Sequence, residues 1–172
     1  VPWLGRLDGS VPLSGLKGLV DLLQKNGIPV RHAGKPVLSW MVEDVIPLMQ
    51  SHGLAPGFVL LIPGSSARHP EKRWPYYPEL AKELVIRGMV VVTVLGPEEQ
   101  ALAKDMPGCV LSALSWFQLA GLMRHASFIV GNDSGPSHLA SALGRPGLAL
   151  FGPHTSAMRA EIRRDSFQAC EV

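Results

Sequence analysis

From residue 58 onward, short apolar runs alternate with segments in which apolar residues recur at helical spacing. A short apolar run bounded by glycine or proline is typical of a strand that is buried on both faces. The runs of this kind are residues 58–62, 90–95, 109–111, 128–130 and 147–151. Strands that alternate with helices form parallel sheets with right-handed connections. The pattern therefore predicts an α/β fold, with one parallel sheet of about five or six strands and helices on both of its faces.

The segments between these runs are predicted to be helices, because their apolar residues fall three or four positions apart. Ser115 is placed to cap one of them, and Asp133 or Ser134 to cap another. The predicted helices are residues 77–87, 99–104, 116–124 and 136–143. The last part of the chain predicts a basic helix and then a short strand.

The first third of the chain lacks this regular alternation. Residues 14–25 predict an amphipathic helix, residues 36–38 a short strand, and residues 39–52 a second helix that Pro47 kinks or restarts. A proline- and glycine-containing linker follows, so we divide the chain into residues 1–56 and 57–172. The sequence starts without Met and in mid-pattern, and we therefore expect it to be a piece of a larger protein.

Composition narrows the class of partner. Of the 172 residues, 47% are apolar and 17% are charged, which suits a buried parallel sheet. The net charge of +2 is too small to favour nucleic acid or a bulk membrane surface as a partner. Two cysteines, Cys109 and Cys170, form neither a disulfide framework nor a metal-binding motif, so a reducing cytoplasm is expected. No apolar run approaches the length needed to cross a membrane.

Four of the predicted strands end in small or polar residues. These ends are residues 63–66, 96–98, 131–135 and 152–155. Because the carboxyl ends of parallel strands share one edge, they should line a common crevice, where α/β proteins bind ligands. We expect Ser65, Glu98, Asp133 and Gly152 along this edge.

The residues at this edge suit a nucleotide diphosphate. Serine hydroxyls and the free N–H groups at a helix start can donate to phosphate oxygens, and Lys72 adds a positive charge. Glu98 can accept from ribose hydroxyls and Asp133 from sugar hydroxyls. Each residue also has a purely structural interpretation. In that interpretation the serines only form a turn, and Lys72 lies on a solvated face. Glu98 sits in the first turn of a helix, where the helix dipole favours an acidic residue, and His138 is a packed or capping histidine. Trp74 is expected to pack its loop rather than to stack on a base.

Several other kinds of site are disfavoured. The segment GNDSGP superficially resembles the nucleophile segment of chymotrypsin-like proteases, but that chemistry requires an all-β context with an upstream His and Asp. The Walker A pattern is absent, which disfavours a P-loop kinase, and no G-x-G-x-x-G follows the first strand, which disfavours a dinucleotide oxidoreductase. No cluster of His, Cys and carboxylates has metal-ligand spacing.

In combination, the motifs resemble those of a known family. PGSS at 63–66, KRWP at 72–75, GPEE at 96–99 and GNDSGPSHLASALGRPGLALFGPHT at 131–155 resemble the ADP-heptose:lipopolysaccharide heptosyltransferases, glycosyltransferase family 9. The resemblance covers residue 58 to about residue 156. It implies a Rossmann-like, C-terminal half of a GT-B glycosyltransferase, with residues 57–172 as the nucleotide-sugar donor-binding domain. Residues 1–56 would then be the linker and helices from the end of the N-terminal domain.

The same resemblance implies a donor-binding set. Its members are Ser65, Ser66, Lys72, Ser134, Gly135 and His138 for the phosphates, Glu98 for the ribose, Leu114 for adenine, and Asp133 for the heptose hydroxyls. The family's catalytic base is an Asp near the start of the first domain, a region outside this sequence. The chain is therefore expected to hold no catalytic residue, cofactor or metal ion.

The function implied by the resemblance is transfer of heptose from ADP-heptose to the lipopolysaccharide core, with inversion. The enzyme would be cytoplasmic and peripheral on the cytoplasmic face of the inner membrane, and the isolated chain would be inactive without its acceptor domain. Two alternatives stay open. One is a non-catalytic module that binds a nucleotide or nucleotide-sugar. The other is a sugar-nucleotide epimerase of the same architecture, which would require further catalytic residues from a first domain.

Overall fold

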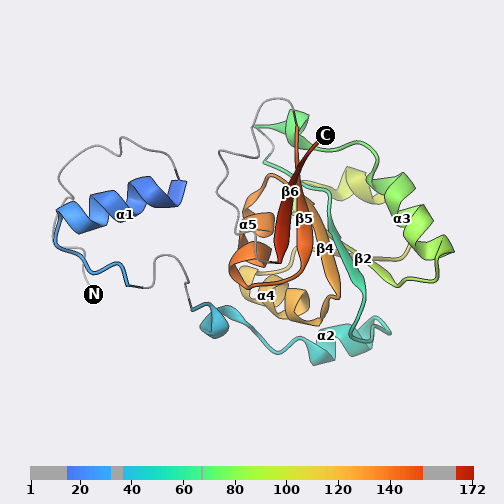
Figure 1. Cartoon of the computed structure of the whole chain (residues 1–172). Coiled ribbons are helices and arrows are strands. Elements are labelled where there is room, and N and C mark those ends of the chain that lie inside the picture. The colour runs from blue at the N-terminus through green and yellow to red at the C-terminus, as the bar shows by residue number, and fades with distance from the viewer. Residues whose placement is uncertain (1–14, 32–36, 67, 153–165) are drawn as a thin grey trace.

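A six-stranded parallel sheet forms the centre of the computed structural model, which describes residues 15–31, 37–66, 68–152 and 166–172 (Figure 1). The strand order is β3-β2-β1-β4-β5-β6, the order of a Rossmann-like sheet. The strands are β1 Val59–Ile62, β2 Val91–Leu95, β3 Cys109–Ser112, β4 Phe128–Asn132, β5 Gly147–Phe151 and β6 Phe167–Glu171. This confirms the predicted fold class and the short strand predicted near the end of the chain.

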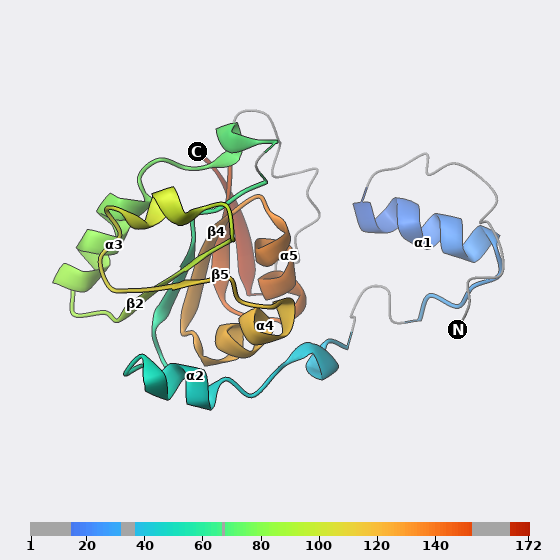
Figure 2. The same ribbon diagram turned by 180° about the vertical axis from the view of Figure 1, so that it is seen from behind.

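Helices cover both faces of the sheet (Figures 1 and 2). The α-helices of the described residues are α1 Gly15–Lys25, α2 Ile46–Ser51, α3 Tyr77–Ile86, α4 Trp116–His125 and α5 Gly135–Ala142. Buried strand residues alternate between two hydrophobic clusters: Leu60 packs with residues of α4 and α5, whereas Val59 packs with residues of α3. The right-handed connections therefore place α4 and α5 on one face and α3 on the other.

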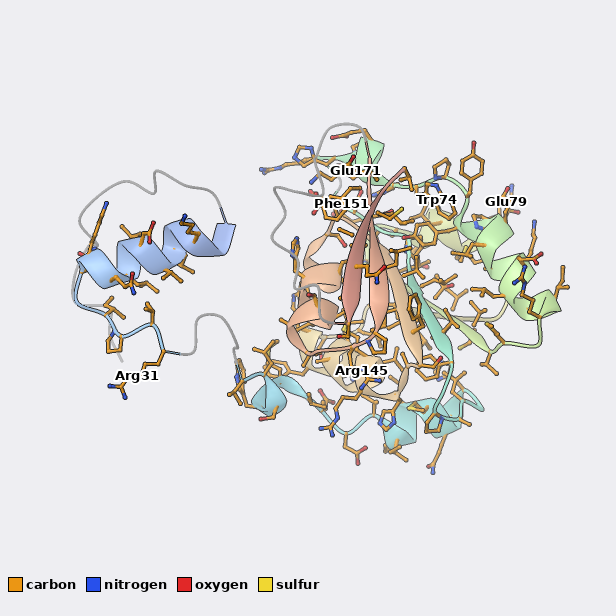
Figure 3. The ribbon with its side chains drawn as sticks, viewed as in Figure 1. Arg31, Trp74, Glu79, Arg145, Phe151 and Glu171 are labelled. Atoms are coloured by element: carbon orange, nitrogen blue, oxygen red, sulfur yellow. The ribbon has the colours of Figure 1, made fainter. Side chains whose placement is uncertain are left out.

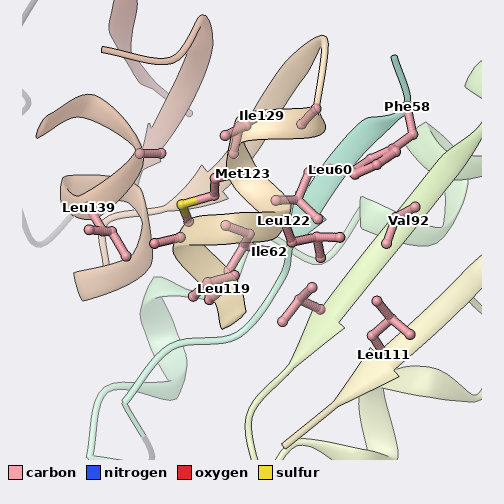
Figure 4. Packing of buried hydrophobic residues seen from close by; sticks show 14 of the residues in the cluster. Phe58, Leu60, Ile62, Val92, Leu111, Leu119, Leu122, Met123, Ile129 and Leu139 are labelled. Carbon is pink, nitrogen blue, oxygen red and sulfur yellow. The ribbon is translucent and has the colours of Figure 1, made fainter. Parts of the chain in front are cut away.

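The cluster on the α4 side forms the larger part of the core. Leu122 and Met123 of α4 are fully buried, and they lie between Leu139 of α5 and the strand residues Leu60 and Ile129 (Figure 4). Val45 and Met49, which precede the sheet in sequence, are also buried in this cluster. The segment around α2 is thus packed against the α4 side of the sheet.

Local predictions outside the sheet were less accurate. The strand predicted at 36–38 was wrong, because Val37 and Leu38 are not in a strand, while residue 36 lies outside the described residues. The long helix predicted at 39–52 is a 3₁₀ turn, Ser39–Met41, followed by four non-helical residues, 42–45, and then α2. Asp44 Oδ1 accepts from the backbone N–H of Ile46 at 3.0 Å and so favours a new helix start, where Pro47 is tolerated.

Two further helices differ in detail. The helix predicted at 99–104 is a 3₁₀ helix, Gln100–Ala103. The helix that starts after Ser115 is confirmed, with a capping box in which Ser115 Oγ accepts from Gln118 N and the Gln118 side chain accepts from Ser115 N.

The basic helix predicted after residue 152 falls on residues 153–165, outside the described residues. Within the described ranges, no helix is long and apolar enough to cross a membrane.

Candidate functional site

The carboxyl ends of the strands meet at one edge of the sheet, as the sequence predicted. The register pairs Ile62 with Gly131 and Asn132 with Leu150, so the segments that follow β1 and β4 leave the sheet at the same level. Figure 3 shows Phe151, the last residue of β5, and Trp74 at this end of the sheet. Ser65 and Asp133, which follow β1 and β4, therefore lie on the same edge.

A cavity of about 340 Å³ opens at this edge between the loops after β1 and β2 and the starts of α4 and α5. Five of the residues predicted from the sequence line it: Ser65, Ser66, Leu114, Ser134 and Gly135. Serines lie at the β1 and α5 sides, and apolar side chains line the part next to α4. The cavity thus combines polar groups suited to phosphates with an apolar part suited to a flat ring.

Ser134 is the polar side chain in this cavity without a local partner. It occupies the N-cap position of α5, yet its hydroxyl makes no capping hydrogen bond. Its Oγ is shielded from water and has no hydrogen-bond partner within the described part of the chain. A buried hydroxyl without a partner is costly and is uncommon in folded proteins. Ser134 therefore has an unused hydrogen-bonding group at a helix start, where N–H groups also lack intrahelical partners.

The two serines after β1 differ in what they can donate. Ser65 Oγ donates to the carbonyl oxygen of His69 at 2.9 Å, so its proton is already used. Ser66 is exposed, and its Oγ accepts from the backbone N–H of Arg68 at 3.3 Å, which leaves its proton free. Ser66 is thus the better hydroxyl donor of the pair toward a phosphate.

Lys72, Asp133 and His138 form an ionic cluster outside the residues that line the cavity. Lys72 Nζ donates to Asp133 Oδ2 at 2.7 Å, and His138 Nε2 lies 3.5 Å from Asp133 Oδ1. The prediction that the Asp133 or Ser134 side chain caps α5 was wrong, because the Asp133 carboxylate faces the Lys72 ammonium and the His138 ring instead. Asp133 is adjacent to Ser134 in the chain, so the ionic cluster continues the cavity's edge.

Glu98 and Glu99 occupy different positions in the turn after β2. Glu98 is exposed and lines a smaller hollow of about 280 Å³, together with Ser65 and Arg73. Glu99 lines both hollows, and its Oε2 accepts from the backbone N–H of Gly96 at 2.7 Å. Glu98 was predicted from the sequence and Glu99 was not, because the contact of Glu99 with the Gly96 N–H forms only in the folded turn.

Asn132 is a second residue that the sequence analysis missed. It is fully buried, and its Nδ2 donates to the carbonyl oxygens of Pro63 at 2.8 Å and Gly64 at 3.2 Å. Its Oδ1 accepts from Trp74 N at 3.2 Å and from the Tyr77 hydroxyl at 3.3 Å. Asn132 therefore joins the end of β4 to both ends of the loop after β1 and fixes the walls of the cavity.

The aromatic residues around Asn132 support the loop rather than a ligand. Trp74 makes edge-on contacts with the rings of Tyr76 and Tyr77, at centroid distances of 5.5 and 5.4 Å. The expectation that Trp74 packs its loop is confirmed. Burial raises the pKa of Tyr77 far above its usual range.

Comparison with known proteins decides the family. Residues 31–166 match the model of glycosyltransferase family 9 (heptosyltransferase). The chain belongs to this family. The matched segment contains every residue of the cavity, the ionic cluster and the turn after β2.

Relatives within glycosyltransferase family 9 are longer than this chain. Lipopolysaccharide heptosyltransferase 2 of Escherichia coli K12 is 37% identical over 101 residues, which are 49% of this chain and 28% of that protein. The structure of E. coli heptosyltransferase WaaC with ADP matches with a TM-score of 0.59 and 26% identity, over 69% of this chain and 37% of that chain. A family 9 structure from Veillonella parvula, at 22% identity, shares the fold with a TM-score of 0.76 over 98% of this chain and 51% of that chain. The chain thus spans about half or less of these proteins.

Within the described residues, no group of three or more His, Cys, Asp or Glu side chains is arranged to hold a metal ion. The charged side chains of this family 9 site instead pair with one another. Arg73 Nη2 donates to the carbonyl oxygen of Ser65 at 3.3 Å and lies 4.0 Å from Glu99 Oε1, so Arg73 braces the loop after β1.

Proposed function

We propose that this chain is the donor-binding part of an inverting heptosyltransferase, which transfers heptose from ADP-heptose to the lipopolysaccharide core. Membership of glycosyltransferase family 9 supports the proposal, and so does the cavity at the carboxyl edge of the sheet. The single observation that carries it is the unpartnered Ser134 hydroxyl at the start of α5. A diphosphate would supply the acceptor that this hydroxyl lacks, at the positive end of a helix.

The diphosphate is proposed to lie between the loop after β1 and the start of α5. Ser66 and Ser134 donate from opposite sides, and the backbone of Gly135 allows close approach. Ser65 holds the loop through His69 and contributes to the wall. His138 lies within the first turn of α5, at the outer side of the same phosphates.

The nucleoside is proposed to extend toward the start of α4. Leu114 lines this part of the cavity and would contact the adenine ring. Glu98, in the turn after β2, would accept from the ribose hydroxyls. Glu99 holds that turn through the N–H of Gly96.

The sugar is proposed to lie over the ionic cluster. Asp133 accepts from the heptose hydroxyls, while Lys72 places its ammonium between this carboxylate and the β-phosphate. The exposed fractions of these side chains, 25% for Lys72 and 10% for Asp133, leave the lysine accessible from the solvent side. The ionic cluster would thereby contact both the sugar and the phosphate, on either side of the bond between the anomeric carbon and the phosphate oxygen.

The reaction is a single displacement. An acceptor hydroxyl attacks the anomeric carbon as the bond from that carbon to the phosphate oxygen breaks, and the electron pair leaves with ADP. By family resemblance, an Asp outside this chain takes the hydroxyl proton. The domain described above serves the leaving group, since fixed N–H donors stabilise developing charge by about 2.7–4 kcal/mol each.

The domain arrangement and location belong to the same proposal. Residues 57–172 would be the donor domain, and residues 1–56 the end of the acceptor domain and the linker. The E. coli relative solved with ADP supports adenine as the base, and the names of the curated relatives support a lipopolysaccharide acceptor. The enzyme would work in the cytoplasm, on the inner face of the membrane that carries this acceptor.

Replacement of Ser134 tests the observation that carries the proposal. Ser134→Ala should lower affinity for ADP and for pyrophosphate by about 1.5–3 kcal/mol, the range for a hydrogen bond to a charged group. Its melting temperature should stay the same or rise, because the variant loses a buried hydroxyl without a partner. Ser39→Ala, at an exposed turn, is the matched control. A lower melting temperature with unchanged ADP affinity would assign Ser134 to folding and remove the main support for the site.

A further inference from the structure

Trp116 presents an aromatic ring at the cavity and is not among the residues proposed to bind the donor. It is the first residue of α4, it lines the cavity between Leu114 and Leu119, and it is 52% exposed. An exposed tryptophan is unusual because its large apolar surface favours burial.

The indole reaches from the start of α4 to the start of α5. A Cβ placed on Gly135 would lie 3.1 Å from Trp116 Cη2, so the ring edge lies close to the backbone of the first residue of α5. Leu114, two residues before Trp116 in the sequence, lines the same cavity. The ring therefore lies in the part of the cavity between the starts of α4 and α5.

The backbone around Trp116 holds the ring in this position. The capping box of Ser115 and Gln118 fixes the start of α4. Ala113, immediately before Leu114, has a φ of 57°, which turns the chain sharply after β3. Leu114 and Trp116 are thus presented by a short, well-defined turn.

The other described tryptophans have ring partners. Trp40 contacts Phe117 at 6.0 Å, and Trp74 contacts two tyrosines. Among the residues described in the structure, the ring of Trp116 has no aromatic neighbour. A flat ligand ring would provide one, in an arrangement that aromatic pairs favour.

We propose that Trp116 is a base-binding residue, on whose indole the purine ring of the nucleotide stacks. The inference rests on the proposed function, because it takes the ligand of the cavity to be a nucleotide. Stacking of this kind depends little on which base is bound, because every base has a π-face. Trp116 would therefore contribute affinity, whereas Leu114 and the cavity wall would contribute selectivity for the shape of the base.

A comparison of ADP, which has a base, with pyrophosphate, which has none, distinguishes stacking from a structural role of Trp116. We expect Trp116→Ala to lower ADP affinity about 10-fold, within the range for loss of one base–aromatic stack. Affinity for pyrophosphate, which has no base, should change less than about 2-fold because its contacts do not include the stack. Trp116→Phe should restore most of the ADP affinity, and Trp40→Ala, which removes a comparably exposed tryptophan away from the cavity, should change neither affinity.

Fluorescence gives a readout that does not depend on folding of the alanine variant. ADP should quench the emission of the unmodified protein and of Trp40→Phe, whereas Trp116→Phe should lose most of this quenching. Equal losses of ADP and pyrophosphate affinity, or unchanged quenching in Trp116→Phe, would overturn the stacking role. If the unmodified protein prefers UDP or GDP, the proposed donor is wrong, and the same variants titrated with the preferred nucleotide against pyrophosphate still decide the role of Trp116.

Discussion

Lys72 Nζ lies 2.7 Å from Asp133 Oδ2 and so joins two residues that are 61 positions apart in the sequence. The contact ties the loop after β1 to the turn between β4 and α5. It also pairs the residue expected to bind the donor phosphate with the residue expected to bind the donor sugar. Each of these groups satisfies the charge of the other.

Removal of the Asp133 charge should affect the binding of ADP and of ADP-heptose differently. Asp133→Asn frees the ammonium of Lys72, so affinity for ADP should stay the same or rise severalfold, while affinity for ADP-heptose relative to ADP falls. The unfolding free energy should drop by only about 1 kcal/mol, because the pair is partly exposed to solvent. Calorimetric titration of both ligands, with melting temperatures alongside, measures these effects. Equal losses for the two ligands would make Asp133 a structural residue of the turn.

Lys72 should act on the phosphates and not on the nucleoside. Lys72→Ala should weaken ADP binding by about 1.5–3 kcal/mol, as expected for a charge-assisted hydrogen bond, and leave adenosine binding unchanged. Lys82→Ala, at an exposed position of α3, is a control for the change in net charge. If ADP and adenosine lose affinity to the same extent, Lys72 supports the fold or lies on a solvated face.

Glu98 and Glu99 offer a matched pair in one turn. Glu98→Gln should lower affinity for ADP but not for pyrophosphate, and its exposed side chain should leave the melting temperature unchanged. Glu99→Ala removes the acceptor of the Gly96 N–H and should lower the unfolding free energy by about 1–2 kcal/mol. Glu99→Gln keeps an acceptor oxygen for the Gly96 N–H. If Glu99→Gln lowers ADP affinity and Glu98→Gln does not, the ribose contact belongs to Glu99.

Tyr77 should make the stability of the protein fall at alkaline pH. Its pKa is raised above the usual 10.0 by burial, so the folded state keeps the proton that the unfolded state releases. This contribution is fully present below pH 10 and is lost as pH rises above it, by about 1.4 kcal/mol per pH unit.

The Tyr77→Phe variant isolates this effect. At pH 7 it should be less stable by about 1 kcal/mol, because it lacks the hydrogen bond to Asn132. Above pH 10 the difference should shrink and then reverse. Urea unfolding at several pH values measures it, and Tyr76→Phe, an exposed neighbour, should show no such change. Parallel pH dependences for the unmodified protein and Tyr77→Phe would contradict the burial argument.

The strands and their common edge could be predicted because continuous apolar runs mark strands buried on both faces. The prediction failed where a single backbone contact decides the local structure, as with Asp44 and Pro47 at the start of α2. The roles of Asn132 and Glu99 could not be predicted, since both depend on carbonyl and N–H groups that only the folded loops bring within reach. The pairing of Lys72 with Asp133 likewise depends on the tertiary structure, which also shows why Asp133 does not cap α5.

The central claim is that the cavity holds the adenosine diphosphate part of a heptose donor. Calorimetric titration of the whole chain with ADP, UDP and GDP, followed by ADP-heptose, tests it most directly. The account predicts that ADP binds more tightly than UDP or GDP, and that ADP-heptose binds at one site in competition with ADP. Absence of nucleotide binding, or ADP binding no tighter than UDP and GDP, would contradict it.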